Sequence, residues 1–294
     1  MKREALALEV TSVVLGASRD FLVREGFVEL LPVILAPVTD PLRTTPEWAV
    51  ISAYGRSWYL TRSMIFHKQA AIRVHPKIFC FSPNVRLEPA ERAQTGRHLF
   101  EFVQLDLEVR GASREEVMDL GERLLLHILS QVRRECGKSL EREIPEYSRP
   151  FPRISWQEAR QEFGEDFEVE LSRRSKTPLW LVDFPIDQRE FYDREDPKRP
   201  GVLLDMDLLY PEGFGEALSG GEREYQLERL KARILRQGLS LDAFRPILAL
   251  AADGLPPSAG FGIGVERLVR FICGFPHVAQ VRLFPRVPGE EAPL

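Results

Sequence analysis

The chain has 294 residues, 44% of them hydrophobic, so it can bury a substantial core as one large domain or two small ones. A net charge of −4 argues against a sequence-independent grip on nucleic acid, which requires a basic face. Its three cysteines are scattered without CxxC spacing, so neither a disulfide framework nor a zinc knuckle is indicated. Charged residues at positions 2–4 and the lack of a long apolar stretch predict a cytoplasmic protein without a signal peptide or membrane span.

The N-terminal third predicts a helix, an extended run and a second helix. Apolar residues at helical spacing over 6–25 end at Gly26 and lead into an extended run over 27–35. Residues 60–69 begin like a capped helix. Lys68 in that segment, taken alone, is interpreted as a solvated lysine.

Residues 78–88 and 98–109 alternate as strands, and the polar residues 89–97 between them predict an antiparallel hairpin with a long loop. Residues two apart in a strand share a face. One face of the hairpin therefore carries polar residues and an aromatic ring, namely Asn84, Arg86, Glu88, Phe102, Gln104, Asp106 and Glu108.

That polar face permits two interpretations. It is either a solvated sheet face with cross-strand ion pairs, which is common in antiparallel sheets, or a nucleotide site. The second interpretation gains from three side chains, because Phe102 suits a base, Arg86 a phosphate and Glu108 a divalent cation.

The middle of the chain predicts further packed elements. Apolar residues over 117–132 form one stripe, which is typical of a core helix. Residues 137–201 are an excursion containing a helical pattern over 155–163 and a strand over 179–184. Since strands and helices do not alternate as in a parallel sheet, we expect an α+β fold in which helices flank an antiparallel sheet. Residues 1–294 are expected to form a single domain.

Glycines punctuate the C-terminal third. Residues 207–216 are interpreted, taken alone, as an acidic turn. A glycine-spaced run over 258–268 opens an apolar helix over 265–273 but lacks the GxGxxG spacing of a dinucleotide fold. Alternate glycines instead allow a flat ring to lie against bare backbone, so that Arg267 and Phe102 could sandwich an adenine.

In this order, the segments resemble the catalytic core of class II aminoacyl-tRNA synthetases, specifically the aspartyl and asparaginyl branch. Residues 85–88, 97–102 and 104–108 look like the second signature motif of that class, and residues 260–268 look like the third. Residues 215–224 and the ending 283–289 are similar to this branch. The resemblance spans nearly the whole chain.

The resemblance implies a site for ATP and magnesium, Mg2+, that activates a carboxylic acid as its adenylate. The implied catalytic residues are Arg86 and Arg267. The implied roles are Arg86 for the α-phosphate and the carboxylate, Glu88 for the adenine amino group, His98 for the γ-phosphate, Phe102 and Arg267 for adenine stacking, and Asp207 and Glu216 for magnesium.

The resemblance also implies an amino-acid site. Asp106, with Gln104 nearby, matches the position that receives the ammonium group, and Lys68 and Arg223 match two cations that recognise an aspartate carboxylate. Two such cations favour a dicarboxylic acid over asparagine. One departure is Ile65, which stands where the aspartyl enzymes have a substrate-binding glutamine.

A second departure concerns the acceptor. The first helix already belongs to the catalytic core, so the sequence contains no preceding anticodon-binding barrel, and we expect tRNA to be an unlikely partner for an acidic core. The leading hypothesis is an AMP-forming asparagine synthetase, in which ammonia attacks the β-adenylate of aspartate. Asp40 or another acid would deprotonate ammonium.

Two alternatives stay open. One is an aminoacyl transferase that charges a tRNA or another carrier, and the other is a non-catalytic regulatory paralogue. Because the first helix and residues 27–32 resemble the dimer-forming first motif of the class, we also expect a homodimer.

Overall fold

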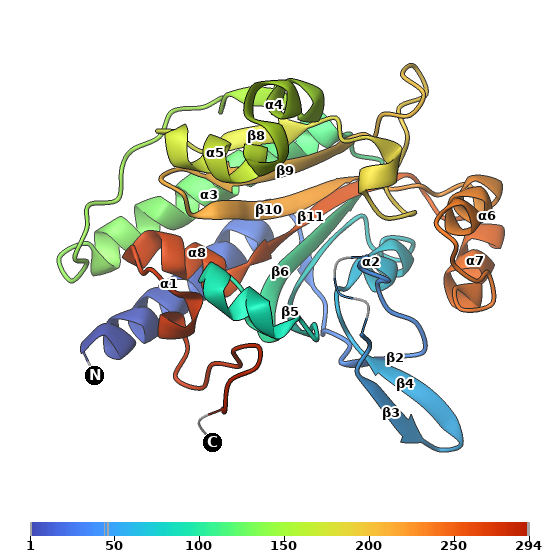
Figure 1. The fold of residues 1–294 in the computed structure, drawn as a ribbon, viewed down its shortest axis with the longest axis horizontal. Helices are drawn as coiled ribbons and strands as arrows, with labels where there is room; N and C mark the ends of the chain where they lie inside the picture. Colours follow the sequence, from blue (N-terminus) through green and yellow to red (C-terminus); the bar gives the residue numbers. More distant parts are fainter. Residues whose placement is uncertain (1, 44, 46, 293–294) are drawn as a thin grey trace.

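The computed structural model describes residues 2–43, 45 and 47–292. Within them, eight strands form one mixed, mainly antiparallel sheet (Figure 1). Only the pairs at its two edges, β1 with β5 and β7 with β8, are parallel. In spatial order the strands are β1 (Val28–Glu29), β5 (Lys77–Val85), β6 (Glu101–Arg110), β11 (Ser258–Gly264), β10 (Gly215–Glu222), β9 (Asp205–Tyr210), β8 (Leu179–Val182) and β7 (Arg153–Ser155).

One face of this sheet packs on three helices, α1 (Lys2–Arg24), α3 (Arg114–Cys136) and α8 (Val265–Cys273). Their apolar stripes meet the inward side chains of the strands, among them Leu105, Leu107 and Phe261. Because side chains alternate along a strand, Gln104, Asp106 and Glu108 lie on the opposite face. The main core therefore lies behind the sheet, and polar residues line its front.

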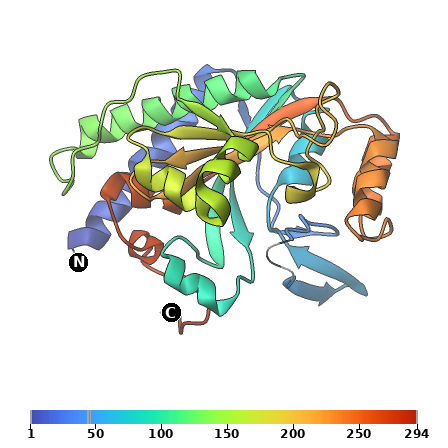
Figure 2. The same cartoon turned by 45° about the horizontal axis from the view of Figure 1, so that its top comes forward.

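The front face is covered at both ends and open between them. At one end α4 (Trp156–Phe163) and α5 (Phe167–Arg174) form a second core with β8 and β9. At the other end α2 (Ile65–Ala71) lies against β5 and β6. The helices α6 (Leu227–Arg236) and α7 (Arg245–Ala252) stand at the edge of the molecule, near a small sheet of β2 (Leu35–Ala36), β4 (Arg56–Leu60) and β3 (Val50–Ala53) (Figure 2).

The predicted fold class, helices around a mainly antiparallel sheet, is confirmed. The predicted helix over 265–273 has the same bounds in the structure, and the helix over 117–132 lies within α3. The excursion at 137–201 supplies β7 and β8 to the main sheet together with α4 and α5.

Two expectations about local structure were wrong. Residues 207–216 are not a turn, because they include most of β9 and the start of β10 and only 211–214 connect the strands. Pairing with β8 and β11 on either side overrides the turn preference of the polar residues. The first strand of the hairpin ends at Val85, since the backbone N–H of Arg86 donates to Phe100 and that of Glu88 donates back to Arg86.

Candidate active site

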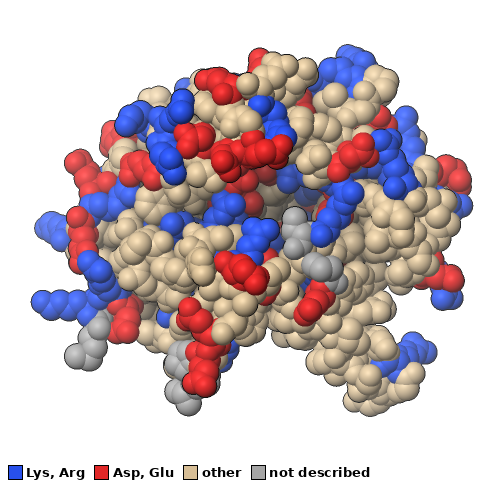
Figure 3. Space-filling view, in the orientation of Figure 1, with Lys and Arg blue, Asp and Glu red and all other residues tan. Residues whose placement is uncertain are grey.

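The open front of the sheet contains two adjoining pockets that share Arg86, Gln104 and Glu216. These three residues come from the end of β5, from β6 and from β10. The space-filling view shows acidic and basic side chains intermingled around a hollow on this face (Figure 3). Mixed charge of this kind suits polar small molecules better than a uniformly charged polymer.

The first pocket contains every residue that the sequence analysis assigned to ATP. These residues are Arg86, Glu88, His98, Phe102, Glu216 and Arg267. Five lining residues were given no role from the sequence, namely Arg97, Leu99, Gly264, Glu266 and Val278. Glu266 is buried and accepts a hydrogen bond from the backbone N–H of Val103 on β6. This hydrogen bond to β6 holds its carboxylate in the wall of the pocket.

Arg86 is fixed from two sides. Its Nε donates to the carbonyl of Arg62 at 3.0 Å, and its Nη2 donates to Oε1 of Gln104 at 3.3 Å. The guanidinium also lies over the ring of Phe102, 5.0 Å from the centroid. Because an arginine held in this way needs little rearrangement, it can meet an anion in a preset orientation.

Arg267 enters the same pocket from the first turn of α8. Its Nε donates to the carbonyl of Arg97 at 3.1 Å, and its Nη1 lies 3.1 Å from Oε1 of Glu216. Burial opposes ionisation of Glu216, but Arg267 and three further arginines outweigh it and lower the pKa of this carboxyl. Glu216 is therefore an ionised carboxylate at neutral pH.

His98 is neutral in this pocket. Burial, reinforced by Arg267 and Arg97, lowers its pKa to about 3. Its Nδ1 lies 2.5 Å from Oγ1 of Thr95. A neutral imidazole can donate a single hydrogen bond to a phosphate without adding charge.

The second pocket is a cavity of about 300 Å³ that holds every residue assigned to the amino acid, namely Lys68, Gln104, Asp106 and Arg223. Lys68 is buried, not solvated as its sequence context indicated. Its Nζ lies 2.9 Å from Oδ1 of Asp106 and 3.7 Å from Oε2 of Glu108. The other oxygen of Asp106 is buried and has no hydrogen-bond partner among the described residues.

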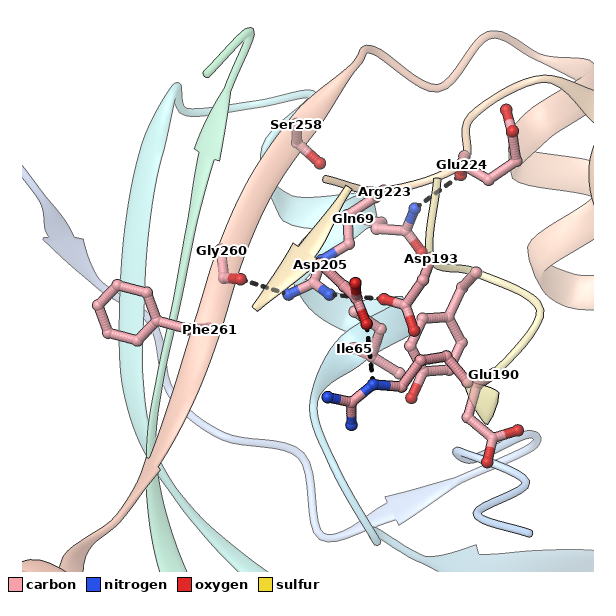
Figure 4. A network of polar contacts seen from close by, with 12 residues as sticks. Ile65, Gln69, Glu190, Asp193, Asp205, Arg223, Glu224, Ser258, Gly260 and Phe261 are labelled. Carbon is pink, nitrogen blue, oxygen red and sulfur yellow. Dashed lines mark hydrogen bonds and ion pairs between the residues drawn. The ribbon is translucent and has the colours of Figure 1, made fainter. Parts of the chain in front are cut away.

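Arg223 is also paired on several sides. Its Nε donates to Glu108 at 3.1 Å, its Nη1 to Asp193 at 3.3 Å and its Nη2 to the carbonyl of Gly260 at 2.8 Å. Figure 4 shows this guanidinium between Gly260 and Asp193, near Ile65. Lys68 and Arg223 thus lie in the pocket as members of ion pairs, which the sequence alone did not reveal.

The expectation that Glu108 binds a divalent cation was wrong. Its carboxylate is fully buried and accepts hydrogen bonds from Arg223 and from the hydroxyl of Ser258, at 2.9 Å from the latter. Ser258 and Arg223 reach it from strand β11 and from the end of β10. Glu108 therefore anchors Arg223.

One wall of the second pocket, the acidic wall, is formed by Asp40, Leu42, Arg189, Glu190, Tyr192 and Asp193. Oδ2 of Asp40 accepts hydrogen bonds from Ser63 at 2.8 Å and from the hydroxyl of Tyr192 at 2.9 Å. Glu190 accepts the backbone N–H of Arg43 on Oε1, whereas its Oε2 is buried without a partner among the described residues. Burial and the nearby Asp40 raise the pKa of Glu190 to about 7.

Most of this wall was not predicted from the sequence. Arg189, Glu190, Tyr192 and Asp193 all come from the irregular segment between β8 and β9, inside the excursion whose role had been left open. No strand or helix period orders these residues, so no local pattern could have placed them. Only Asp40 had been considered, as an acceptor of a proton from ammonium.

The two predicted magnesium ligands lie on neighbouring strands. Asp207 on β9 is buried, its Oδ2 lies 2.6 Å from Nη2 of Arg189, and its Oδ1 has no hydrogen-bond partner among the described residues. Burial raises the pKa of Asp207 to about 7. No cluster of three or more His, Cys, Asp or Glu side chains suited to a metal occurs in 2–43, 45 and 47–292. The free oxygen of Asp207 and the carboxylate of Glu216 fit magnesium, which takes one or two carboxylates and completes its shell with water and phosphate oxygens.

Across the described part of the chain, no helix is long and apolar enough to cross a membrane.

Comparisons with known proteins identify the family. A family model described as tRNA synthetases class II (D, K and N) matches residues 2–288. The asparagine–tRNA ligase of Pelotomaculum thermopropionicum is 32% identical over an alignment 304 positions long, which covers 97% of this chain and 70% of that protein.

Solved structures give the same picture. The asparaginyl-tRNA synthetase of Pyrococcus horikoshii, in complex with asparaginyl-adenylate, superposes with a TM-score of 0.91 at 29% identity, over 99% of this chain and 70% of that one. The aspartyl-tRNA synthetase of Entamoeba histolytica gives a TM-score of 0.79 at 26% identity, over 98% of this chain and 59% of that one. The chain therefore belongs to the class II tRNA synthetases of the D, K and N group and has the fold of their catalytic core.

Proposed function

We propose that this member of a ligase family activates the β-carboxylate of aspartate as an adenylate, which ammonia attacks to give asparagine, AMP and pyrophosphate. The observation that carries the proposal is the charge of the second pocket. Its lining has five carboxylates, Asp40, Asp106, Glu190, Asp193 and Glu216, against four cationic side chains, Lys68, Arg86, Arg189 and Arg223.

Four of these carboxyl groups balance the four cations, and Glu190, whose pKa is raised to about 7, is about half ionised at neutral pH, so the pocket has no positive excess that would hold a lone anion. Aspartate alone adds one net negative charge to it, whereas aspartate together with ammonium adds none. Two substrates whose charges cancel therefore fit this pocket better than aspartate by itself. Each of the two cations assigned to the substrate is also neutralised locally, because Lys68 pairs with Asp106 and Arg223 pairs with Asp193.

Activation would take place where the two pockets meet. Arg86 and Gln104 line both pockets, so a carboxylate in the second can approach the α-phosphate of ATP in the first beside Arg86. Arg86 would stabilise the negative charge that develops on the α-phosphate as the bond between the carboxylate oxygen and phosphorus forms and pyrophosphate leaves. Magnesium held by Asp207 and Glu216 would supply further charge neutralisation on the phosphates.

Ammonium must lose a proton before it can attack. Glu190 is suited to accept it, because one of its oxygens is buried without a partner and its pKa is raised to about 7. The resulting ammonia adds to the acyl carbon, the added nitrogen loses a proton, and the bond from the acyl carbon to the phosphate oxygen breaks so that AMP departs. Asp40 lies in the same wall but its Oδ2 already accepts two hydrogen bonds, so Glu190 replaces it as our preferred acceptor.

A second candidate is aminoacylation of a tRNA. The relatives reported above are an asparagine–tRNA ligase and two tRNA synthetases, and asparagine, which has no net charge, also satisfies the charge argument. A non-catalytic paralogue is disfavoured, since the complete set of predicted ATP residues lines one pocket.

Product analysis distinguishes these functions. The protein is incubated with ATP, magnesium, labelled aspartate and ammonium, and the products are separated by chromatography. Free asparagine formed with AMP supports the proposal. AMP formation that requires tRNA, with labelled tRNA and no free asparagine, overturns it in favour of aminoacylation. Absence of aspartate- or asparagine-dependent pyrophosphate exchange overturns both.

A further inference from the structure

Arg62 is a buried arginine beside the active site that no part of the proposed reaction uses. It follows β4, is 1% exposed and lines neither pocket. Its guanidinium donates to four backbone carbonyls of one short segment, those of Pro41 at 2.7 Å, Asp40 at 3.2 Å, Leu42 at 3.5 Å and Thr45.

Among the ion pairs between described residues none involves Arg62. Burial, reinforced by the neighbouring Arg86, lowers its pKa, although the carboxylates of Asp40, Glu190 and Glu88 act in the opposite direction. Burying a charge whose direct contacts are carbonyl dipoles, with carboxylates acting only from beyond ion-pair distance, costs folding free energy. We therefore expect Arg62 to act by holding the backbone segment whose four carbonyls it binds, and not by stabilising the fold.

The segment that Arg62 gathers forms part of the acidic wall. Asp40 and Leu42 line the second pocket, and the backbone N–H of Arg43 donates to Glu190 at 2.9 Å. Leu42 has a left-handed φ of 40°, which a branched side chain seldom adopts unless neighbouring contacts enforce it. The guanidinium of Arg62 supplies such contacts on both sides of Leu42.

The backbone of Arg62 makes hydrogen bonds both next to residues 40–45 and on the side of Arg86. Its N–H donates to Oγ1 of Thr39 at 3.0 Å, and its carbonyl accepts the hydrogen bond from Nε of Arg86 at 3.0 Å. A single residue thus connects the wall of the amino-acid pocket to the arginine that lines both pockets.

We propose that Arg62 is a positioning residue that couples residues 40–45 to Arg86, so that the wall of the amino-acid pocket and the arginine facing the α-phosphate keep one relative placement. This inference rests on the adenylation step of the proposed function and is independent of the acceptor. Loosening Arg62 lets both sides shift, and a misplacement of about 1 Å at a reacting centre can cost roughly 100-fold in rate.

The test compares Arg62→Lys with a matched control, Arg270→Lys. Arg270 is another buried arginine that donates to backbone carbonyls, those of Pro276 and Phe214, but it lines neither pocket. Rates of pyrophosphate exchange are measured with aspartate and with asparagine, and thermal midpoints identify the loss of stability in each variant. We expect Arg62→Lys to lower kcat about 10- to 100-fold with a smaller change in the KM for ATP, and Arg270→Lys to leave kcat within about twofold.

Hydrogen exchange supplies a second readout. In Arg62→Lys the amides of residues 38–40 and 42 should exchange faster, together with that of Arg43, which is bonded to Glu190, while α3 keeps its protection. A kcat within twofold of the native protein, or a loss that Arg270→Lys reproduces at equal stability, would overturn the coupling.

If Arg62→Lys does not fold, Thr39→Val replaces it, since this change removes the acceptor of the Arg62 N–H and keeps the guanidinium. It should lower kcat to a smaller extent, and an unchanged kcat would count against the proposal. Absence of exchange in the native protein with either amino acid would instead refute the proposed function, and the hydrogen-exchange comparison would still report on the link between Arg62 and residues 40–45.

Discussion

Asp193 decides how much positive charge Arg223 offers to a substrate. It is 6% exposed, lies 3.3 Å from Nη1 of Arg223 and has a pKa raised by its burial. Glu108 neutralises the same guanidinium from the opposite side. Arg223 therefore recognises a ligand as part of a charge cluster, and a change at either acid alters which ligand end it prefers.

Replacing Asp193 with asparagine tests this cluster. The change keeps the shape and removes a negative charge, so Arg223 should attract a carboxylate more strongly and the KM for aspartate in pyrophosphate exchange should fall about 3- to 10-fold. The KM for asparagine should change less, because a carboxamide has no net charge. Equal changes for both amino acids would assign Asp193 a purely structural role.

Glu190 predicts a specific dependence of stability on pH. Its carboxyl has an ordinary pKa near 4.5 and about 7 in the fold, so between these values the folded state binds more protons than the unfolded chain. The contribution of Glu190 to stability therefore falls as the pH rises from 4.5 to 7, by about 2–3 kcal/mol.

The variant Glu190→Gln removes this term. Its unfolding free energy should match that of the native protein near pH 4.5 and exceed it above pH 7, while the formation of asparagine from ammonium declines. Chemical denaturation at several pH values measures the first effect. A difference between variant and native protein that stays constant with pH would show that Glu190 titrates normally.

At the scale of elements, β11 explains why alternate glycines occur in the centre of the sheet. A Cβ at Gly260 would overlap the backbone of Leu107 and the carboxylate of Glu108, and one at Gly262 would approach Nε2 of Gln104 at 2.9 Å and Oδ1 of Asp106 at 3.0 Å. The bare backbone thus leaves room for the side chains of β6. The sequence had predicted that all the alternate glycines of β11 lie against a flat ring. Of Gly260, Gly262 and Gly264, only Gly264 lines the pocket assigned to ATP.

Gly262→Ala tests this interpretation. The added methyl group should displace Gln104 and Asp106, so we expect exchange activity to fall about 10-fold or more. Gly16→Ala is the control, because that position lies in α1 with nothing within 4 Å of the added Cβ and should gain up to about 1 kcal/mol from helix propensity. Full activity in Gly262→Ala would mean that the two side chains need no such clearance.

Local periods account for what the sequence predicts correctly in this site. The alternation along β6 places Gln104 and Asp106 on the polar face, and that placement needs only a strand. Glu190 and Asp193 lack such a pattern, because hydrogen bonds from Arg233 on α6 to their carbonyls hold their segment in place. The predicted role of Glu108 as a cation ligand was wrong for a related reason, because the partners of this carboxylate, Arg223 and Ser258, come from segments distant in the sequence.

At the scale of the whole molecule, the N-terminal segment leaves apolar side chains uncovered. Leu31 is 87% exposed, and Val28, Ile34 and Leu35 beside it in the sequence are also exposed. Neighbouring exposed apolar residues mark interaction sites more often than isolated ones. They overlap the segment that resembles the dimer-forming first motif of the class, so we propose that two copies of the chain associate through it.

Leu31→Glu should weaken that association. A buried apolar contact would become a pair of like charges across a twofold axis, so the variant should be monomeric at concentrations where the native protein is dimeric. Light scattering coupled to size-exclusion chromatography measures both masses. Leu235→Glu on α6 is the control, because Leu235 is 59% exposed but lies outside this segment, and its mass should equal that of the native protein. A monomeric native protein would show that the chain does not form this dimer. A dimer that persists in Leu31→Glu would show that the contact lies elsewhere.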